Sequence, residues 1–160
     1  MTGAAQKWKT FWSLPSDERH VACSAAAGLA ATCLGLRTLG FSRWQRILNR
    51  RAVRVESSNS SSESRSFAIS ANRIAQLQEA AALSLFFHTN CLERSLALWF
   101  LLRQRGFPAE LKFGARKQSE TFEAHAWVEL NGVALNNPTA EQREFVPFDG
   151  AIASLETRAK

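Results

Sequence analysis

The strongest structural signals in this 160-residue sequence lie in residues 90–137, which read NCLERSLALWFLLRQRGFPAELKFGARKQSETFEAHAWVELNGVALNN. Asn90 is a favourable N-cap, and Glu93 follows three positions later, as in a capping box. Apolar residues at spacings of three and four then predict a helix that ends before Gly106. Cys91 takes the first helical position, where backbone N–H groups and the helix dipole favour a thiolate.

A β-meander is predicted after this helix. We expect strands over residues 110–115, 124–130 and 133–135, because apolar residues alternate there. Asn131-Gly132 lies between the second and third strands and is a strong signal for a two-residue hairpin turn. The chain therefore returns on itself directly after the second strand.

A histidine and two amides lie at the strand ends that this hairpin brings together. His125 opens the second strand, and Asn136 and Asn137 follow the third. A cysteine at a helix N-terminus, a histidine and an orienting amide are the groups of Cys-His-Asn nucleophilic catalysis. A two-residue loop puts Asn136 on the face of His125, whereas a bulge would put Asn137 there.

The N-terminal part of the chain is predicted to be helical. Ser16 is expected to cap a helix whose first turn holds Asp17 and Glu18. Residues 21–36 carry no charge, but the run is shorter than the roughly 18 apolar residues of a membrane span. We therefore expect a buried helix of a small subdomain, with a membrane-surface anchor as the alternative.

Arginines gather in the next segment, which is predicted to form a basic helix over residues 41–55. No acidic residue lies among them, and the formal net charge of the whole chain is +6. Such a run binds nucleic acid, an anionic membrane surface or an acidic peptide, or is a solvated face without a partner. The arginines of this run are Arg37, Arg43, Arg46, Arg50, Arg51 and Arg54.

A serine-rich stretch divides the chain into two parts. Residues 57–66 have the composition of a flexible linker. A further helix is predicted over residues 70–88, from its apolar spacing. The expected organisation is an N-terminal helical subdomain (1–56), the linker (57–66) and the part that carries the chemistry (67–160).

The cysteine content bears on the compartment. An odd count of three, without a secretory signal, favours free thiols in a reducing cytoplasm. Cys23 and Cys33 fall in an alanine-rich helix and are expected to be small core residues. The sequence has no metal-ligand spacing and no glycine-rich phosphate loop, so neither a metal nor a cofactor is expected.

The segments CLERSLALWFLLRQRGFPAELKFGARK and FEAHAWVELNGVALNN resemble the stand-alone leader peptidases of lasso-peptide biosynthesis. The resemblance implies an α+β fold in which a helical subdomain precedes a transglutaminase- or papain-like core. It also implies a cysteine peptidase with Cys91 as nucleophile and His125 as general base. Asn137 falls where the family usually has Asp, which favours Asn137 over Asn136 as the third member.

The family also implies partners. These are the precursor peptide, whose leader is removed, a separate leader-recognition protein that binds the leader as an added strand, and a cyclase that closes the freed core. The expected location is the cytoplasm, with peripheral contact at the inner membrane face as an option. No nucleic acid partner is expected.

Two other functions stay open at this point. The same Cys-His-acid order serves acyltransferases of the transglutaminase type, which pass the acyl group to an amine rather than to water. A non-catalytic module could instead use the arginine-rich helix to bind peptide, nucleic acid or membrane, with binding that weakens steeply as salt rises.

Overall fold

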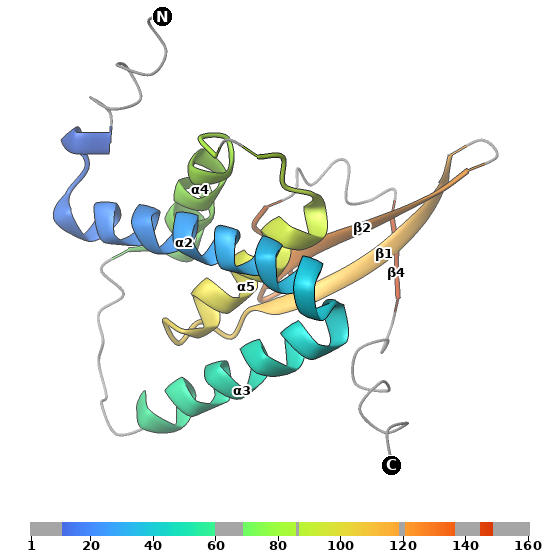
Figure 1. The fold of residues 1–160 in the computed structure, drawn as a ribbon, viewed down its shortest axis with the longest axis horizontal. Helices are drawn as coiled ribbons and strands as arrows, with labels where there is room; N and C mark the ends of the chain where they lie inside the picture. Colours follow the sequence, from blue (N-terminus) through green and yellow to red (C-terminus); the bar gives the residue numbers. More distant parts are fainter. Residues whose placement is uncertain (1–10, 60–68, 86, 119–120, 137–144, 149–160) are drawn as a thin grey trace, which may run out of the picture.

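The computed structural model describes residues 11–59, 69–85, 87–118, 121–136 and 145–148, and combines helices with a curled antiparallel sheet (Figure 1). The helices are α2 (Ser16–Leu39), α3 (Phe41–Asn59), α4 (Ala71–Ala82) and α5 (Cys91–Arg103). The strands are β1 (Glu110–Gln118), β2 (Thr121–Leu130), β3 (Val133–Ala134) and β4 (Val146–Pro147), in the sheet order β3-β2-β1-β4. The predicted α+β class is confirmed.

α2 buries only one of its faces. Val21, Ala25, Leu29 and Cys33 are buried, whereas Cys23 is exposed. The predicted helix over residues 21–36 is therefore present. The interpretation of Cys23 as a core residue is wrong, because its side chain lies on the solvent-facing side of α2. By length and composition α2 is apolar enough to cross a membrane, a test that core helices and signal sequences also pass.

The ends of the first two helices differ slightly from those predicted. Pro15, not Ser16, is the N-cap of α2, and its carbonyl accepts the first helical bond from the Arg19 N–H at 3.0 Å. Ser16 is already helical. α3 begins at Phe41 as expected but continues to Asn59, so the first residues of the predicted linker are helical.

α4 is shorter than predicted. Ser70 caps it as a helix N-cap should, since its side chain accepts from the Arg73 N–H. The helix ends at Ala82 rather than His88. The Ser84 hydroxyl bonds back to the Ala80 carbonyl at 2.8 Å, and the chain turns there, although apolar residues continue the helical pattern beyond it.

β1 and β2 form a longer hairpin than the sequence predicted, and β3 follows through the expected turn. Asn131 and Gly132 both have positive φ, of 52° and 78°, and Leu130 pairs with Val133. These are the features of a two-residue turn that matches strand twist. Figure 1 shows the β1–β2 hairpin extending beyond the helices.

The two faces of the sheet have different surroundings. Val128 of β2 is fully buried in the core that α2, α4 and α5 build, so we call its side of the sheet the Val128 face. The register places on this face Leu111, Phe113, Ala115 and Lys117 of β1 with Val128, Ala126, Ala124 and Phe122 of β2. The other side, the His125 face, holds Lys112, Gly114 and Arg116 of β1 with Trp127, His125 and Glu123 of β2.

Candidate active site

The N-terminus of α5 is fixed by a complete capping box. The Asn90 side chain accepts from the Glu93 N–H at 2.8 Å, and the Glu93 carboxylate accepts from the Asn90 N–H at 2.9 Å. Cys91, half-buried, is the first residue of the helix, as the sequence predicted. Cys91 therefore lies in the first turn, whose backbone N–H groups have no helical acceptor and favour a negative charge nearby.

A second set of bonds ties this helix start to α4. Arg94 donates to the Thr89 hydroxyl at 2.9 Å and to the Glu79 carboxylate at 2.9 Å. Gln78, buried in α4, donates to the Arg94 carbonyl at 2.7 Å. The first turn of α5 is therefore held from both the loop before it and the neighbouring helix.

Glu93 also contacts α2 in the buried layer beneath the cap. The Glu93 carboxylate lies near the Cys33 thiol, and its charge acts on that group. Burial, followed by the Glu93 charge, raises the pKa of Cys33 to about 11, so this thiol stays protonated at neutral pH. Cys33 is the buried core residue that the sequence predicted.

Ser95 anchors α5 to the sheet one turn after Cys91. Its fully buried hydroxyl donates to the Ala126 carbonyl at 2.8 Å and accepts from the Asn136 amide at 2.8 Å. The Ala126 carbonyl points to the β3 edge of β2, because Val128, two residues on, bonds to Leu135 at that edge. The start of α5 therefore lies alongside the edge of β2, next to the residue that follows His125.

The direction of α5 decides where Cys91 lies along β2. The C-terminal end of α5 leads within a few residues to Glu110, which pairs with Glu129 near the end of β2. Since Ser95 meets Ala126 in the middle of β2, the first turn of α5 points toward the start of that strand. Cys91 is on the helix face of Ser95, about 6 Å further along the axis and so level with the first half of β2. The register puts the His125 side chain on the opposite face of the sheet from Val128, against which α5 packs.

Aromatic rings surround His125 on its face of the sheet. Its imidazole stacks on Phe145 with ring centroids 5.0 Å apart and on Trp127 with centroids 6.3 Å apart. Arg116 covers Phe145 at 4.7 Å and pairs with Glu123 at 2.7 Å. The imidazole plane is set by these rings rather than by free rotation.

A glycine makes room for one of these rings. Trp127 is buried, and its indole N–H donates to Glu129 at 2.7 Å. A Cβ at Gly114 would meet the Trp127 ring at 3.0 Å and the Val146 carbonyl at 2.8 Å. A side chain at position 114 would therefore displace either Trp127 or β4.

Of the two candidate amides, only Asn136 lies among the residues that the structure describes. Asn136 bonds at both ends of its amide: the oxygen accepts from the Val128 N–H at 2.8 Å, and the nitrogen donates to Ser95. In the β3 ladder its oxygen takes the place of the Leu135 carbonyl. Asn136 is thus a structural link between α5 and β2, and Asn137, the predicted third member, lies outside the described residues.

Sequence reasoning missed Ser95 and Phe145 as parts of this site. Ser95 had a signal, since it is a lone hydroxyl in an apolar helix, one turn after the cysteine. Phe145 had none, because its contact with His125 is made across the fold. Within the described part of the chain, no three His, Cys, Asp or Glu side chains gather as metal ligands would.

Comparison with known protein families identifies a superfamily. The sequence model of the transglutaminase-like superfamily matches residues 35–148, from the end of α2 to just beyond β4. No curated protein and no solved structure matches the chain.

Proposed function

The chain belongs to the transglutaminase-like superfamily, whose members are generally cysteine proteases or acyltransferases, and from this we propose that it is a cysteine peptidase that removes the leader from a lasso-peptide precursor. The peptidase assignment rests on the superfamily and on the groups at the start of α5. The lasso-peptide substrate rests on the resemblance of residues 91–117 and 122–137 to that group of leader peptidases.

One observation supports the catalytic assignment most strongly. Cys91 opens a helix whose cap is complete, and the same helix is bonded through Ser95 to the carbonyl next to His125. A nucleophile and its base must be held in a fixed relation for covalent catalysis. The Ser95 bond ties together the two elements that carry Cys91 and His125.

In the proposed reaction the Cys91 thiolate attacks the carbonyl carbon of the last leader residue. The tetrahedral intermediate collapses, and His125 gives its proton to the departing amine, which becomes the N-terminus of the core peptide. Water then attacks the thioester, with His125 taking its proton. The free leader acid leaves, and the Cys91 sulfur is released for the next cycle.

The backbone N–H of Cys91 is the proposed donor to the oxyanion, since first-turn N–H groups have no helical partner. Asn137 is proposed to accept from the imidazole N–H and so orient His125. An amide does this without a charge, whereas a carboxylate also stabilises the imidazolium. The proposed partners are the precursor, a separate leader-recognition protein and a cyclase.

The test is a cleavage assay on the cognate precursor with its recognition protein, followed by mass spectrometry. We expect wild type to release an intact leader, and Cys91→Ala and His125→Ala to release none. Cys23→Ala is the matched control, because that cysteine is exposed on α2. Cleavage that survives in Cys91→Ala would overturn the peptidase assignment.

The same assay separates hydrolysis from acyl transfer. With an added amine such as hydroxylamine, an acyltransferase gives the stable amide or hydroxamate of the leader as its main product. A peptidase gives the free acid as the main product when no amine is added. A stable amide as the main product at low amine concentration would reassign the chain to acyl transfer.

The neutral third residue gives a further prediction. Asn137→Asp should raise kcat by about tenfold, because a negative charge beside His125 stabilises the imidazolium that forms in the reaction. Asn136→Asp is the control, and it should lower stability instead, since that amide nitrogen donates to Ser95. An unchanged rate in Asn137→Asp would remove Asn137 from the proposed triad.

A further inference from the structure

The outward side of α2 is apolar and exposed. By length and composition α2 is apolar enough to cross a membrane, yet only 33 % of its most apolar stretch is buried. The buried part lies on one side of the helix, with Val21, Ala25 and Leu29, and packs on α4 and α5. Leu34, on the other side, is 65 % exposed. Burial in the core therefore does not account for the apolar composition of this helix.

Arginines lie at both ends of this exposed side. Arg19 and Arg37 are about five helical turns apart, so they lie on the same side of α2, roughly 27 Å from each other. Residues 21–36, between them, carry no charge. Trp12 is 55 % exposed, and the Arg19 guanidinium lies 5.4 Å from the centroid of its ring. Arginine and tryptophan at the ends of an apolar stretch are typical of helices that lie in a membrane interface.

α3 runs along one edge of this exposed side. Only Gly40 separates the two helices, and the Trp44 ring of α3 lies where a Cβ at Gly35 of α2 would be. Gly35 therefore faces α3, and Arg37, two residues later, points roughly 200° away around α2. The exposed side of α2 thus lies between Arg37 on one edge and α3 on the other.

The outward side of α3 carries a row of arginines. Arg43, Arg46 and Arg50 are exposed, whereas Leu48, on the inner side, is buried. Spacings of three and four place the arginines on one face, over about 10 Å of helix. In the part of the chain that the structure describes, none of the three forms an ion pair with a carboxylate. Residues 19–55 contain no Asp or Glu, so this surface suits an anionic partner.

The apolar side chains favour a bilayer over nucleic acid as that partner. A row of arginines alone suits any polyanion, including a nucleic acid. A phosphate backbone, however, makes no favourable contact with the exposed Leu34 side chain. An anionic bilayer has head groups for the arginines and an acyl boundary for the leucine, so it matches both parts of the surface at once.

We propose that the α2–α3 surface binds an anionic lipid bilayer, with α2 lying flat in the interface. The α2–α3 surface consists of Trp12, Arg19, Leu34, Arg37, Arg43, Arg46 and Arg50. The apolar side of α2 enters the boundary between head groups and acyl chains, and the arginines on both edges bind lipid phosphates. α2 does not cross the bilayer, because its other side is part of the core. The inference uses neither Cys91 nor His125, so it stands apart from the proposed peptidase function.

The first test is co-sedimentation of the full-length protein with large unilamellar vesicles. Vesicles of phosphatidylcholine with roughly 30 % phosphatidylglycerol are compared with vesicles of phosphatidylcholine alone. We expect binding to the anionic vesicles to be at least about tenfold tighter. It should weaken as NaCl rises from about 0.05 M to about 0.5 M, since salt screens the arginine contacts.

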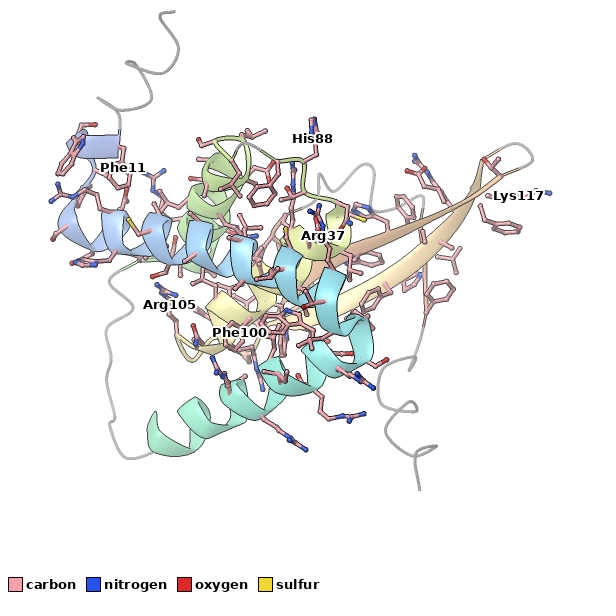
Figure 2. All side chains as sticks on the ribbon, viewed as in Figure 1. Phe11, Arg37, His88, Phe100, Arg105 and Lys117 are labelled. Carbon is pink, nitrogen blue, oxygen red and sulfur yellow. The ribbon has the colours of Figure 1, made fainter. Side chains whose placement is uncertain are left out.

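Removal of charge from α3 tests the arginine row. Arg43→Gln, Arg46→Gln and Arg50→Gln should each weaken binding to the anionic vesicles about fivefold, and the triple variant about 100-fold. Lys117→Gln is the matched control, because it also removes one positive charge. Figure 2 shows Lys117 at the end of the β1–β2 hairpin, away from α2 and α3. Equal weakening in Lys117→Gln would show an effect of net charge alone and would overturn the role of α3.

Leucine truncation tests the apolar contact. Leu34→Ala should weaken binding to the anionic vesicles about fivefold, because contact with the bilayer buries the Leu34 side chain. Leu83→Ala is the matched control, since Leu83 is also 65 % exposed but lies at the end of α4. It should change binding less than about twofold. Circular dichroism checks that both variants keep the wild-type helix content.

Three results would overturn the proposal as a whole. The first is no binding to the anionic vesicles at low salt. The second is vesicle binding that Leu34→Ala leaves unchanged, which would make the contact purely electrostatic; if the arginine variants also lost binding to a DNA duplex, α3 would be assigned to nucleic acid. The third is a wild-type dimer that Leu34→Ala dissociates in sedimentation experiments, which would assign the exposed side of α2 to a second copy of the chain.

Discussion

The two halves of the Val128 face make a useful comparison. Near α5 its side chains are buried and the polar groups beside it are paired, with Ser95 bonded to Ala126 and Asn136. Along the outer hairpin and β4, Phe122 and Val146 face solvent. The covered half therefore holds α5 against the sheet, whereas the open half contributes little to the fold.

The largest difference is expected from valine truncations on the two halves. Val128→Ala should lower the free energy of unfolding by about 2–3 kcal/mol, because it removes fully buried methyl groups and leaves a cavity. Val146→Ala, on the same face but exposed, should change it by less than about 0.5 kcal/mol. Urea denaturation measures both, and equal effects would contradict the comparison.

The next effect concerns the polar anchor. Ser95→Ala should cost about 1–3 kcal/mol, because it leaves the Ala126 carbonyl and one Asn136 N–H without their buried partner. It should also slow cleavage, since the bond holds α5 against the strand of His125. Ser84→Ala is the control, because its hydroxyl is exposed. An unaffected cleavage rate in Ser95→Ala would show that this bond does not position the site.

A pH-dependent effect is expected from Cys33. Because burial and Glu93 raise the pKa of its thiol from 9.0 to about 11, the folded state favours the protonated form. Its contribution to stability is complete below pH 9 and is lost as the pH rises from 9 toward 11. Cys33→Ser, compared with wild type by urea denaturation across this range, should lose that slope. The same slope in both proteins would contradict this assignment.

The smallest effect is expected from a partly buried ion pair between α2 and α4. Arg73 bonds to Glu18 at 2.7 Å and lowers the pKa of that carboxyl. The pair therefore contributes stability above the unfolded-state pKa of Glu18, about 4.3, and this is lost as the pH falls through the lower folded-state pKa. Glu18→Gln should flatten the acid limb of the stability curve slightly, with Asp17→Asn as the control.

Local signals predicted local structure well. The capping box at Asn90 and Glu93 and the turn at Asn131-Gly132 depend on residues close in sequence, and both form as expected. The α4 end was misplaced because apolar spacing continues past Ala82 without a glycine or proline to stop it. The sequence did not show which side of α2 is buried, because both sides of this alanine-rich helix are similarly apolar. The burial of Cys23 could therefore not be predicted.

The parts of the site that sequence could not give are contacts between distant segments. Ser95 meets Ala126, 31 positions later, and Phe145 stacks on His125 from beyond the hairpin. Asn136 shares a strand face with His125 by register, but its amide bonds to Val128 and Ser95 instead. Strand register predicts on which face of the sheet a side chain lies, but it does not predict the hydrogen-bond partner of that side chain.

The most direct test of the account is to trap the reaction intermediate. Wild-type protein would be quenched in acid during turnover of the precursor, digested, and mapped by mass spectrometry. The account predicts a leader-derived acyl group on Cys91, none on Cys23 or Cys33, and none anywhere in Cys91→Ala. Leader release with no acyl group on Cys91, and continuing in Cys91→Ala, would contradict it.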